Sequence, residues 1–458
     1  MKKNMFNHKP EALIFYSFLL AIMVGTVLLK LPFSSKNNPL PWIDALFMAT
    51  SAVCVTGLSV VDVGTGLTLF GQIVILSLIQ WGGLGIMTFS LLFLISIGKR
   101  ISLHSQLCIQ DLSQDMSFRN IKYSVFLILG MTFIIESLGA ILLFFCLRPY
   151  HSFPFAVYSS IFHSVSAFCN AGISLYADNL MGFHKNPPVL LILMSLIILG
   201  GLGFIVIYEV GRIVMNKTRG NKKIPMSLHS RIALIGSVFF VLGGGLIVWF
   251  LESRGTMRSL PISYQILNAL FLSVTSRTAG FNTIDTAMLS NPTLFLVIFL
   301  MFIGACPGST AGGIKIHTFL SVAALVRNKL KGLEMASLFK RKIPEAIVDR
   351  ALTIFISSCL LILIAVFLLQ MAENLSISHT KVNPQEDFLD TLFEAVSAFG
   401  TPGLSTGITT YLSSWGKMII VFLMLIGRIG PLTLGIALQT RQSRKIVYGF
   451  PNEEIIVS

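Results

Sequence analysis

The stretch SAVCVTGLS at residues 51–59 decides how this chain folds, because a closely similar phrase returns three more times. The other copies are SAFCNAGIS at 166–174, VTSRTAGFN at 274–282 and SAFGTPGLS at 397–405. We call these four segments the glycine phrases, after Gly57, Gly172, Gly280 and Gly403. The glycines are 115, 108 and 123 residues apart, so the repeat fills about a quarter of the chain. We expect four copies of one unit around a shared axis.

The composition predicts a membrane protein. Of the 458 residues, 54% are hydrophobic and 12% are charged, whereas an ordinary soluble domain carries roughly 25% charged residues. Apolar runs such as 12–29, 123–147 and 351–369 are long enough to cross a bilayer as helices. The six cysteines lack metal-ligand spacing and are interpreted as small apolar residues. We expect an all-α polytopic protein of the bacterial cell membrane, without a cleaved signal peptide.

The net charge of +14 would suit a nucleic-acid binder, but its distribution favours a membrane topology. If both termini are cytoplasmic and each unit crosses twice, the inner segments hold 23 of the 34 Lys and Arg residues. That excess is the positive-inside pattern of membrane proteins. The basic residues of a nucleic-acid-binding surface would not be concentrated in every second loop of a membrane topology. No nucleic-acid partner is therefore expected.

Each unit is predicted to contain a long apolar helix, a short apolar stretch, a glycine phrase and a second apolar helix. The first short stretch, 42–53, is too short to span a bilayer. A short helix followed by extended chain at membrane depth must be buried in protein or line water. We therefore expect eight spanning helices and four re-entrant pore loops around one central pore.

The predicted boundaries follow from this repeat. The units are 1–115, 116–225, 226–345 and 346–440, with a cytoplasmic tail at 441–458. Their pore loops are 42–59, 155–174, 264–282 and 387–405. The second helix of the first unit is expected over 67–97.

The glycine phrases have the composition of a selectivity filter for a monovalent cation. Glycine permits backbone angles that turn carbonyl groups toward an axis, and carbonyl oxygens from four loops can replace the hydration shell of an alkali ion. The predicted filter residues are Val55, Thr56, Gly57, Asn170, Ala171, Gly172, Thr278, Ala279, Gly280, Thr401, Pro402 and Gly403. All are neutral, which argues against a divalent-cation pore. The alternative is that the glycines are turns at which helices pack closely.

A second repeated phrase lies in the second helix of each unit. It reads GGLG at 82–85 and at 200–203 and GRIGP at 427–431, and paired glycines let membrane helices approach or bend. The third unit instead has GACPGSTAGGIK at 304–315, which cannot continue a regular helix. We interpret 304–313 as a gate, and Lys315 as a side chain that snorkels to the inner interface. The predicted gate residues are Gly304, Ala305, Cys306, Pro307, Gly308, Ser309, Thr310, Ala311, Gly312, Gly313 and Arg428.

Arg428 is a functional candidate because a guanidinium within a membrane is costly unless it faces water or a partner. On the pore axis it would repel cations and donate hydrogen bonds to carbonyl groups of the break. The alternatives are a static kink in place of a gate, and a buried salt bridge of Arg428 with Glu136 or Glu209.

Further polar residues near the glycine phrases are interpreted as braces. Arg277, three residues before Gly280, is expected to hold its own loop through backbone hydrogen bonds. Asp44, Asp390 and Glu394 lie in short stretches and are expected to act similarly.

Together these motifs resemble the Trk/Ktr/HKT superfamily of potassium transporters. The resemblance rests on four single-glycine loops (VTGL, NAGI, TAGF and TPGL), the glycine-rich break of the third unit and the Arg of the fourth. It extends over nearly the whole chain. The early start of the first unit and the tail YGFPNEEIIV at 448–457 resemble the bacterial KtrB-type membrane subunit.

The resemblance implies channel-like K⁺ uptake, with K⁺ held at the four filter glycines and a gating loop at 304–313 that has Arg428 as its partner. It implies a homodimer with one pore per subunit, embedded in membrane lipid. It also implies a nucleotide-binding cytosolic ring of the KtrA type, docked on the inner face near 327–342 and the C-terminus. Na⁺ would stimulate transport, and no tightly bound cofactor is expected.

Two other functions stay open on the sequence alone. A Na⁺/K⁺ symporter of the same fold would need a second cation site, which the sequence does not identify. A polytopic membrane enzyme would need a catalytic cluster, but the eight histidines are scattered and no Walker-type loop is present. His163 stands alone in a short stretch, where we expect a structural role. With one glycine per loop, we hypothesise few coordinating layers and a selectivity below that of a multilayer filter.

Overall fold

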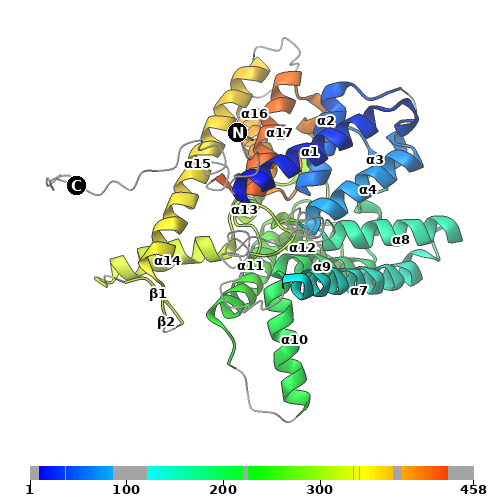
Figure 1. The fold of residues 1–458 in the computed structure, drawn as a ribbon. Coiled ribbons are helices and arrows are strands. Elements are labelled where there is room, and N and C mark those ends of the chain that lie inside the picture. The colour runs from blue at the N-terminus through cyan, green and yellow to red at the C-terminus, as the bar shows by residue number, and fades with distance from the viewer. Residues whose placement is uncertain are drawn as a thin grey trace, which may run out of the picture.

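The computed structural model of the chain describes residues 10–36, 38–85, 121–219, 225–333, 335–339, 341–374 and 384–431. The predicted cytoplasmic tail at 441–458, and the basic inner segment up to residue 120, lie outside the described residues. The described chain is mostly helical, as Figure 1 shows.

The helices recur in the predicted order. The first helices of the four units are α1 (Pro10–Lys30), α7 (Ile121–Leu147), α11 (Leu228–Glu252) and α15 (Glu345–Asn374). The short helices are α2 (Trp42–Cys54), α8 (Phe153–Phe168), α12 (Ile262–Ser276) and α16 (Pro384–Gly400). The second helices are α4 (Leu69–Gly83), α9 (Pro187–Leu202), α13 (Asn291–Phe302) and α17 (Ser414–Ile429).

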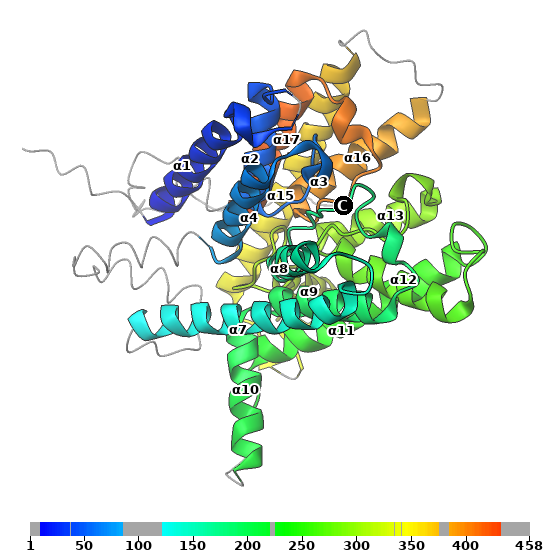
Figure 2. The same ribbon diagram turned by 90° about the vertical axis from the view of Figure 1, so that its right-hand side faces the viewer.

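The remaining elements are small or lie beyond the second helices. The helix α10 (Phe204–Thr218) follows α9 and projects away from the bundle in Figures 1 and 2. The helix α14 (Ile316–Leu330) precedes an antiparallel hairpin of β1 (Ser337–Leu338) and β2 (Arg341–Lys342), in which Ser337 pairs with Lys342. Short turns are α3 (Val63–Gly66), η1 (Pro32–Ser34), η2 (Met181–Phe183), η3 (Thr286–Met288) and η4 (Ile408–Tyr411).

Among the described residues, three helices are long and apolar enough to cross a membrane, namely α7, α11 and α15. The pair α9 and α10 would form a fourth span, but it is bent by 102°. The long helices carry large exposed apolar side chains, including Phe145, Phe250 and Phe367. Such exposure suits a surface covered by lipid chains, because in water a contiguous apolar face of this kind would be a liability.

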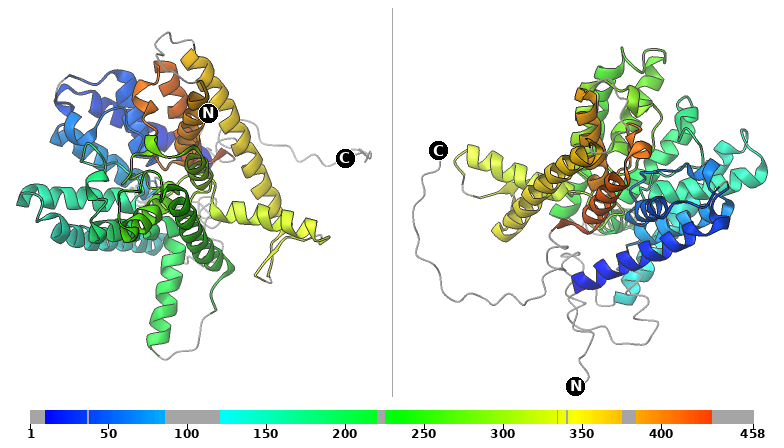
Figure 3. Two further views of the ribbon diagram at one scale, coloured as in Figure 1. Left: turned by 180° about the vertical axis from the view of Figure 1, so that it is seen from behind. Right: turned by 90° about the horizontal axis from the view of Figure 1, so that it is seen from above.

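The units pack in one cyclic order. The second helix of each unit contacts the short helix of the next, in the pairs α4 with α8, α9 with α12, α13 with α16, and α17 with α2. The last pair returns from the fourth unit to the first, which closes the ring. Figure 3 shows the resulting arrangement from two further sides, with the blue helices of the first unit beside the orange ones of the fourth.

Three of the second helices end or bend one or two residues after a repeated glycine that sits directly on a short helix. A Cβ at Gly82, Gly200 or Gly427 would overlap the carbonyl oxygen of Val53, Phe168 or Phe399, each near the end of its own unit's short helix. Of the helix predicted over 67–97, the structure describes α4, which ends at Gly83. Its continuation from residue 86 lies outside the described residues.

The interior is filled by the short helices. Phe47, Phe162 and Phe393 stand ten residues before their phrase glycines and are fully buried, while the third unit buries Phe271 instead. Because these aromatic side chains fill the space behind the glycine phrases, the phrases are held on a packed support.

Candidate functional site

The four glycine phrases meet in a closed ring. A Cβ built on Gly57 would overlap the carbonyl oxygen of Ala171, and one on Gly172 that of Ala279. In the same way, Gly280 lies against Pro402 and Gly403 lies against Thr56. The predicted filter residues are thus brought together, each unit touching the next in the order found for the helices. The glycines also have φ between 62° and 96°, which side chains rarely adopt.

In three of the four phrases, the residue two places before the glycine has a conformation that the sequence did not indicate. Val55, Asn170 and Thr401 adopt φ of 54°, 61° and 58°, the left-handed region. Each follows the end of a short helix, where a left-handed residue is a usual cap. After α2, for example, the Val55 N–H donates to Ala52 O at 3.2 Å. A β-branched residue such as valine is strained in this conformation, and such strain is typical of functional sites.

The ring is lined by neutral oxygen atoms. The short helices point their C-terminal, partially negative ends at it, which favours a cation. Thr56, Thr278 and Thr401 are buried there, and the hydroxyls of Thr56 and Thr401 have no hydrogen-bond partner among the described residues. A buried hydroxyl without a partner is costly, so these oxygens suit a cation that has left its water behind.

A cavity of about 220 Å³ lies at the ring on the side of the loops that precede α4 and α9. Its lining includes Gly57, Asp62, Gly172, Tyr176, Asn179 and Thr410. The lining mixes polar groups with aliphatic side chains such as Val61 and Ile173, and Asp62 contributes one carboxylate. A hydrated cation could therefore wait at this mouth and enter the ring.

On the opposite side of the ring, the break between α13 and α14 passes under the glycine phrases. Its neck is closed by hydrogen bonds, Gly304 N to Ile314 O at 2.8 Å and Ile316 N to Ala305 O at 3.1 Å. Beyond the neck, a Cβ on Gly312 would overlap the Thr401 side chain of the fourth unit. The predicted gate residues therefore form a compact loop that touches the filter candidates directly.

The loop is held by backbone groups of two other units. Cys306 N donates to Gly201 O at 3.0 Å, and Gly313 N donates to Gly427 O at 3.2 Å. Thr310 Oγ1 accepts from Asn170 Nδ2 at 2.8 Å. Several polar groups of this irregular backbone thus find partners in other units, which matters at membrane depth because water is scarce there.

Arg428 ties the loop to the first unit. Its guanidinium donates to the carbonyl oxygens of Thr310 and Gly82. In the described part of the chain its acceptors are carbonyl groups, whereas Glu136 accepts from Gln80 at 3.1 Å. The expected hydrogen bonds to the break are therefore present, and the alternative salt bridge with Glu136 or Glu209 is not.

The structure places two further basic residues differently from the sequence prediction. Arg277 reaches Gly304 O at 3.5 Å, so it contacts the break and not its own glycine phrase. Lys315 was expected to snorkel, but its Nζ donates to Ala311 O at 2.5 Å and to Gly312 O at 3.3 Å. Both side chains turn inward because the loop offers carbonyl groups that no helix satisfies.

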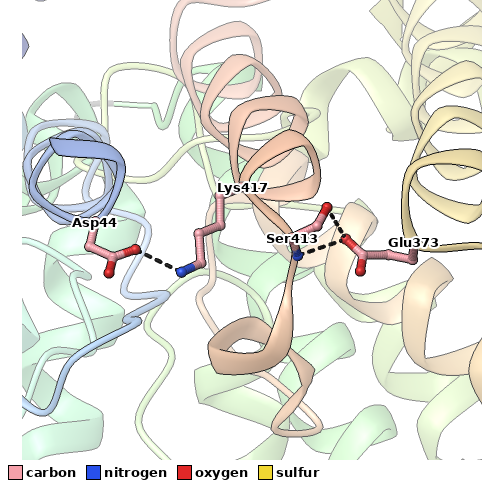
Figure 4. A network of polar contacts seen from close by, with 4 residues as sticks. All are labelled: Asp44, Glu373, Ser413 and Lys417. Carbon is pink, nitrogen blue, oxygen red and sulfur yellow. Dashed lines mark hydrogen bonds and ion pairs between the residues drawn. The ribbon is translucent and has the colours of Figure 1, made fainter. Parts of the chain in front are cut away.

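One of the predicted braces joins two units near the other face. Asp44 of α2 forms an ion pair with Lys417 of α17 at 2.7 Å, and Figure 4 shows the two side chains bridging the helices. On the far side of α17, Glu373 accepts from the N–H and hydroxyl of Ser413 at 3.0 and 2.9 Å. These contacts fix the start of α17 between the first unit and its own first helix.

Comparison with known proteins gives a consistent result. The family model for TrkH, described as a cation transport protein, matches residues 7–446. The chain is 38% identical over 448 residues to the Ktr system potassium uptake protein B of Bacillus subtilis, covering 97% of this chain and 96% of that protein. It is 35% identical to the potassium/sodium uptake protein NtpJ of Enterococcus hirae, covering 98% and 97%.

Among solved structures, the fold is similar to that of the potassium transporter TrkH from Vibrio parahaemolyticus. The TM-score is 0.73 at 18% sequence identity, and the match covers 96% of this chain and 87% of that one. At this identity the likeness concerns the fold.

Proposed function

This chain belongs to the TrkH family of cation transport proteins, and from that premise we propose that it is a channel-like potassium uptake protein. The membrane potential would drive uptake, since one charge gains about 2.3 kcal/mol per 100 mV. Transport, not catalysis, is the activity that we assign. The observation that carries the proposal is the ring in which each phrase glycine lies against a carbonyl oxygen of the next unit.

In this proposal the ring is the K⁺ filter. Carbonyl oxygens of the four phrases, with the hydroxyls of Thr56 and Thr401, would replace the water of a passing ion. The absence of formal charge among the predicted filter residues suits a monovalent ion that must leave again. The cavity bordered by Asp62 would be the extracellular mouth, and we infer that both termini lie in the cytoplasm.

The loop 304–313 would be the gate. It lies directly beneath the ring and contacts Asn170 and Thr401, so an ion leaving the filter would meet it first. Arg428 holds the loop and adds a positive charge at the same depth. Conduction would require the loop to leave this position, which the few backbone hydrogen bonds from other units permit.

The partner subunits that we propose are inferred from the names of the relatives. The name of the Bacillus subtilis relative implies a system of several subunits. We infer a nucleotide-binding cytosolic ring of the KtrA type on the inner face, where α14 and the β1–β2 hairpin present Arg341 and Lys342. We also infer a homodimer in membrane lipid, and stimulation by Na⁺.

The second candidate function is Na⁺/K⁺ symport, which the printed name of the Enterococcus hirae relative favours. The two candidates differ in whether Na⁺ crosses with K⁺ or acts without crossing. Tracer Na⁺ entry measured during K⁺ uptake separates them, because symport requires a fixed ratio of the two fluxes.

The test is growth of a K⁺-uptake-deficient bacterium at low external K⁺, with and without a KtrA-type partner. The wild-type chain is expected to restore growth with the partner. Gly57→Ala should lower K⁺ uptake more than tenfold, because its Cβ would overlap Ala171 O. The control is Gly243→Ala in α11, where no atom lies within 4 Å of the new Cβ. Normal uptake by a folded Gly57→Ala variant would contradict the filter.

A further inference from the structure

A buried carboxylate holds the outer end of the fourth glycine phrase. Glu394 of α16 stands nine residues before Gly403 and is fully buried. It accepts from the hydroxyl of Ser405, two residues after that glycine, at 2.9 Å. It also accepts from the hydroxyl of Thr409, whose oxygen lies 2.9 Å from Ser405 Oγ. The short helix and the chain leaving the phrase are thereby joined across Gly403.

The second unit has the same strut, built from a different side chain. His163 of α8 stands nine residues before Gly172 and is buried, and its Nε2 lies 3.0 Å from the hydroxyl of Ser174. The Leu175 N–H donates to the same nitrogen at 3.4 Å, so Nε2 is the acceptor. The proton is then on Nδ1, which lies 2.7 Å from Ser159 O.

In the second unit this strut ends close to the filter. The Ser174 hydroxyl donates to His163 Nε2, and the same oxygen lies 3.3 Å from Asn179 O. Asn179 Nδ2 donates to the carbonyl oxygen of Gly172 at 3.4 Å. His163 therefore holds a hydroxyl that lies beside the residue bonded to a phrase carbonyl.

The other two units lack this polar contact. At the same position the first unit has Met48 and the third has Phe271, both fully buried. A phenyl ring accepts no ordinary hydrogen bond, and a thioether is a weak acceptor. The serine position two residues after the glycine is filled by Ser59 in the first unit and by Asn282 in the third.

The two polar struts face each other across the ring. Contacts between helices run in the order first, second, third, fourth and back to first, so the second and fourth units are diagonal neighbours. Figure 2 shows their short helices, α8 and α16, on opposite sides of the centre. The ring therefore has one diagonal that is hydrogen-bonded and one that is packed with apolar side chains.

We propose that His163 and Glu394 are positioning residues that set the preference for K⁺ over Na⁺ by holding one diagonal of the ring apart. The proposal rests on the proposed filter function. Na⁺ is smaller than K⁺, so its coordination by the same oxygens requires them to move inward. A strut that anchors the chain just beyond the filter glycine opposes that movement in the second and fourth units. The other diagonal has no hydrogen bond of this kind to lose, because Met48 and Phe271 stand at the equivalent position.

The experiment measures competing K⁺ and Na⁺ uptake into vesicles that contain the full-length chain. Ser405→Ala and Ser174→Ala remove one hydroxyl each and create no bulk. Each is expected to lower the K⁺/Na⁺ uptake ratio about fivefold, the factor associated with one hydrogen bond. The matched control is Ser59→Ala, at the equivalent position of the first unit, which should leave the ratio unchanged.

A second set of variants tests the struts themselves. Glu394→Met and His163→Met introduce the residue that the first unit has at this position, and should lower the ratio as the serine variants do. Glu394→Gln keeps an acceptor for the Ser405 hydroxyl and should retain most of the wild-type K⁺/Na⁺ uptake ratio. Combined with Ser405→Ala, Glu394→Met should add less than it does alone, because both changes remove the Glu394–Ser405 contact and only the contact with Thr409 is then left to lose. A purely structural role would reduce folded protein and both fluxes equally.

The outcomes separate this inference from the function on which it rests. If Gly57→Ala abolishes uptake but the serine and strut variants keep the wild-type ratio, the positioning role is overturned and the filter stands. If Gly57→Ala also leaves uptake and ratio intact, the proposed function itself fails. An equal loss of ratio in Ser59→Ala would overturn the difference between the diagonals.

Discussion

The second and third units interrupt their second helices at the same depth in two different ways. In the second unit, one residue, Gly203, separates α9 from α10, and the two helices are bent by 102°. In the third unit, residues 303–315 separate α13 from α14 and form a loop that crosses beneath the ring. A single-residue bend leaves few backbone groups without helical partners, whereas the longer break must find acceptors and donors elsewhere.

The partners of the longer break come from its neighbours. Its N–H groups donate to Gly200, Gly201 and Gly427, and its Thr310 carbonyl accepts from Arg428. The break is therefore held by contacts between units, which can be exchanged without unfolding a helix. The end of α9 before the bend at Gly203 therefore forms part of the surface that holds the break, and the break is the element that is held.

The largest effect on stability is expected from a side chain at Gly200, in the surface that holds the break. Its Cβ position overlaps Phe168 O, and its carbonyl oxygen accepts from Thr310 N at 3.3 Å. Gly200→Val should destabilise the fold by at least about 3 kcal/mol, because neither neighbour can withdraw. Thermal unfolding in detergent measures this. The control is Gly201→Ala, whose Cβ would lie 3.3 Å from Ala305 Cβ and should cost less than about 1 kcal/mol.

The next effect concerns the tie between the break and the first unit. Arg428→Gln removes two charge-assisted hydrogen bonds, each worth about 1.5–3 kcal/mol. The break should then leave its position more often, and K⁺ uptake per folded molecule should rise about tenfold, which one such bond accounts for. Vesicle uptake at a fixed membrane potential measures this.

Two further variants make the test of Arg428 specific. Arg428→Lys keeps the charge but lacks the planar fork, so an intermediate rise is expected if the tie matters and none if only the charge matters. Lys417→Gln removes a basic residue from the same helix and thereby breaks the ion pair with Asp44. This control should change K⁺ uptake less than twofold. Unchanged K⁺ uptake in folded Arg428→Gln would contradict the hypothesis that the break is the gate.

Much of this fold could be predicted because the repeat marks its own parts. The glycine phrases fixed the place of the short helices, and a run of glycines with Pro307 could only interrupt a helix. Family membership and the uptake function were predicted and are confirmed by the comparisons. The filter and gate roles of single residues stay predictions, although the structure brings those residues together.

The rest depends on contacts that local sequence does not encode. Val55 and Thr401 are left-handed although β-branched residues disfavour that region, because the helix ahead and the ring behind fix their conformation. Lys315 bonds loop carbonyls that exist only once the break is folded. The sequence predicts a brace at Glu394, but its equivalence to His163 emerges only when the units are aligned on their glycines and the ninth residue before each is compared.

The smallest effect isolates the conformation of the break from its contacts. Gly308 has φ of 70°, and the nearest atom to a new Cβ is Ile205 Cδ1 at 3.8 Å. Gly308→Ala should therefore disfavour this loop conformation by about 1 kcal/mol through backbone strain alone. If the break must leave this conformation for ions to pass, uptake should rise by a factor of about two to five. The control is Gly332→Ala, after α14, which has φ of 72° and no atom within 4 Å. Both variants should lose similar stability, and Gly332→Ala should leave K⁺ uptake unchanged. If uptake also rose in Gly332→Ala, backbone strain elsewhere in the chain would affect transport equally. The comparison between a static bend in the second unit and a movable break in the third would then fail.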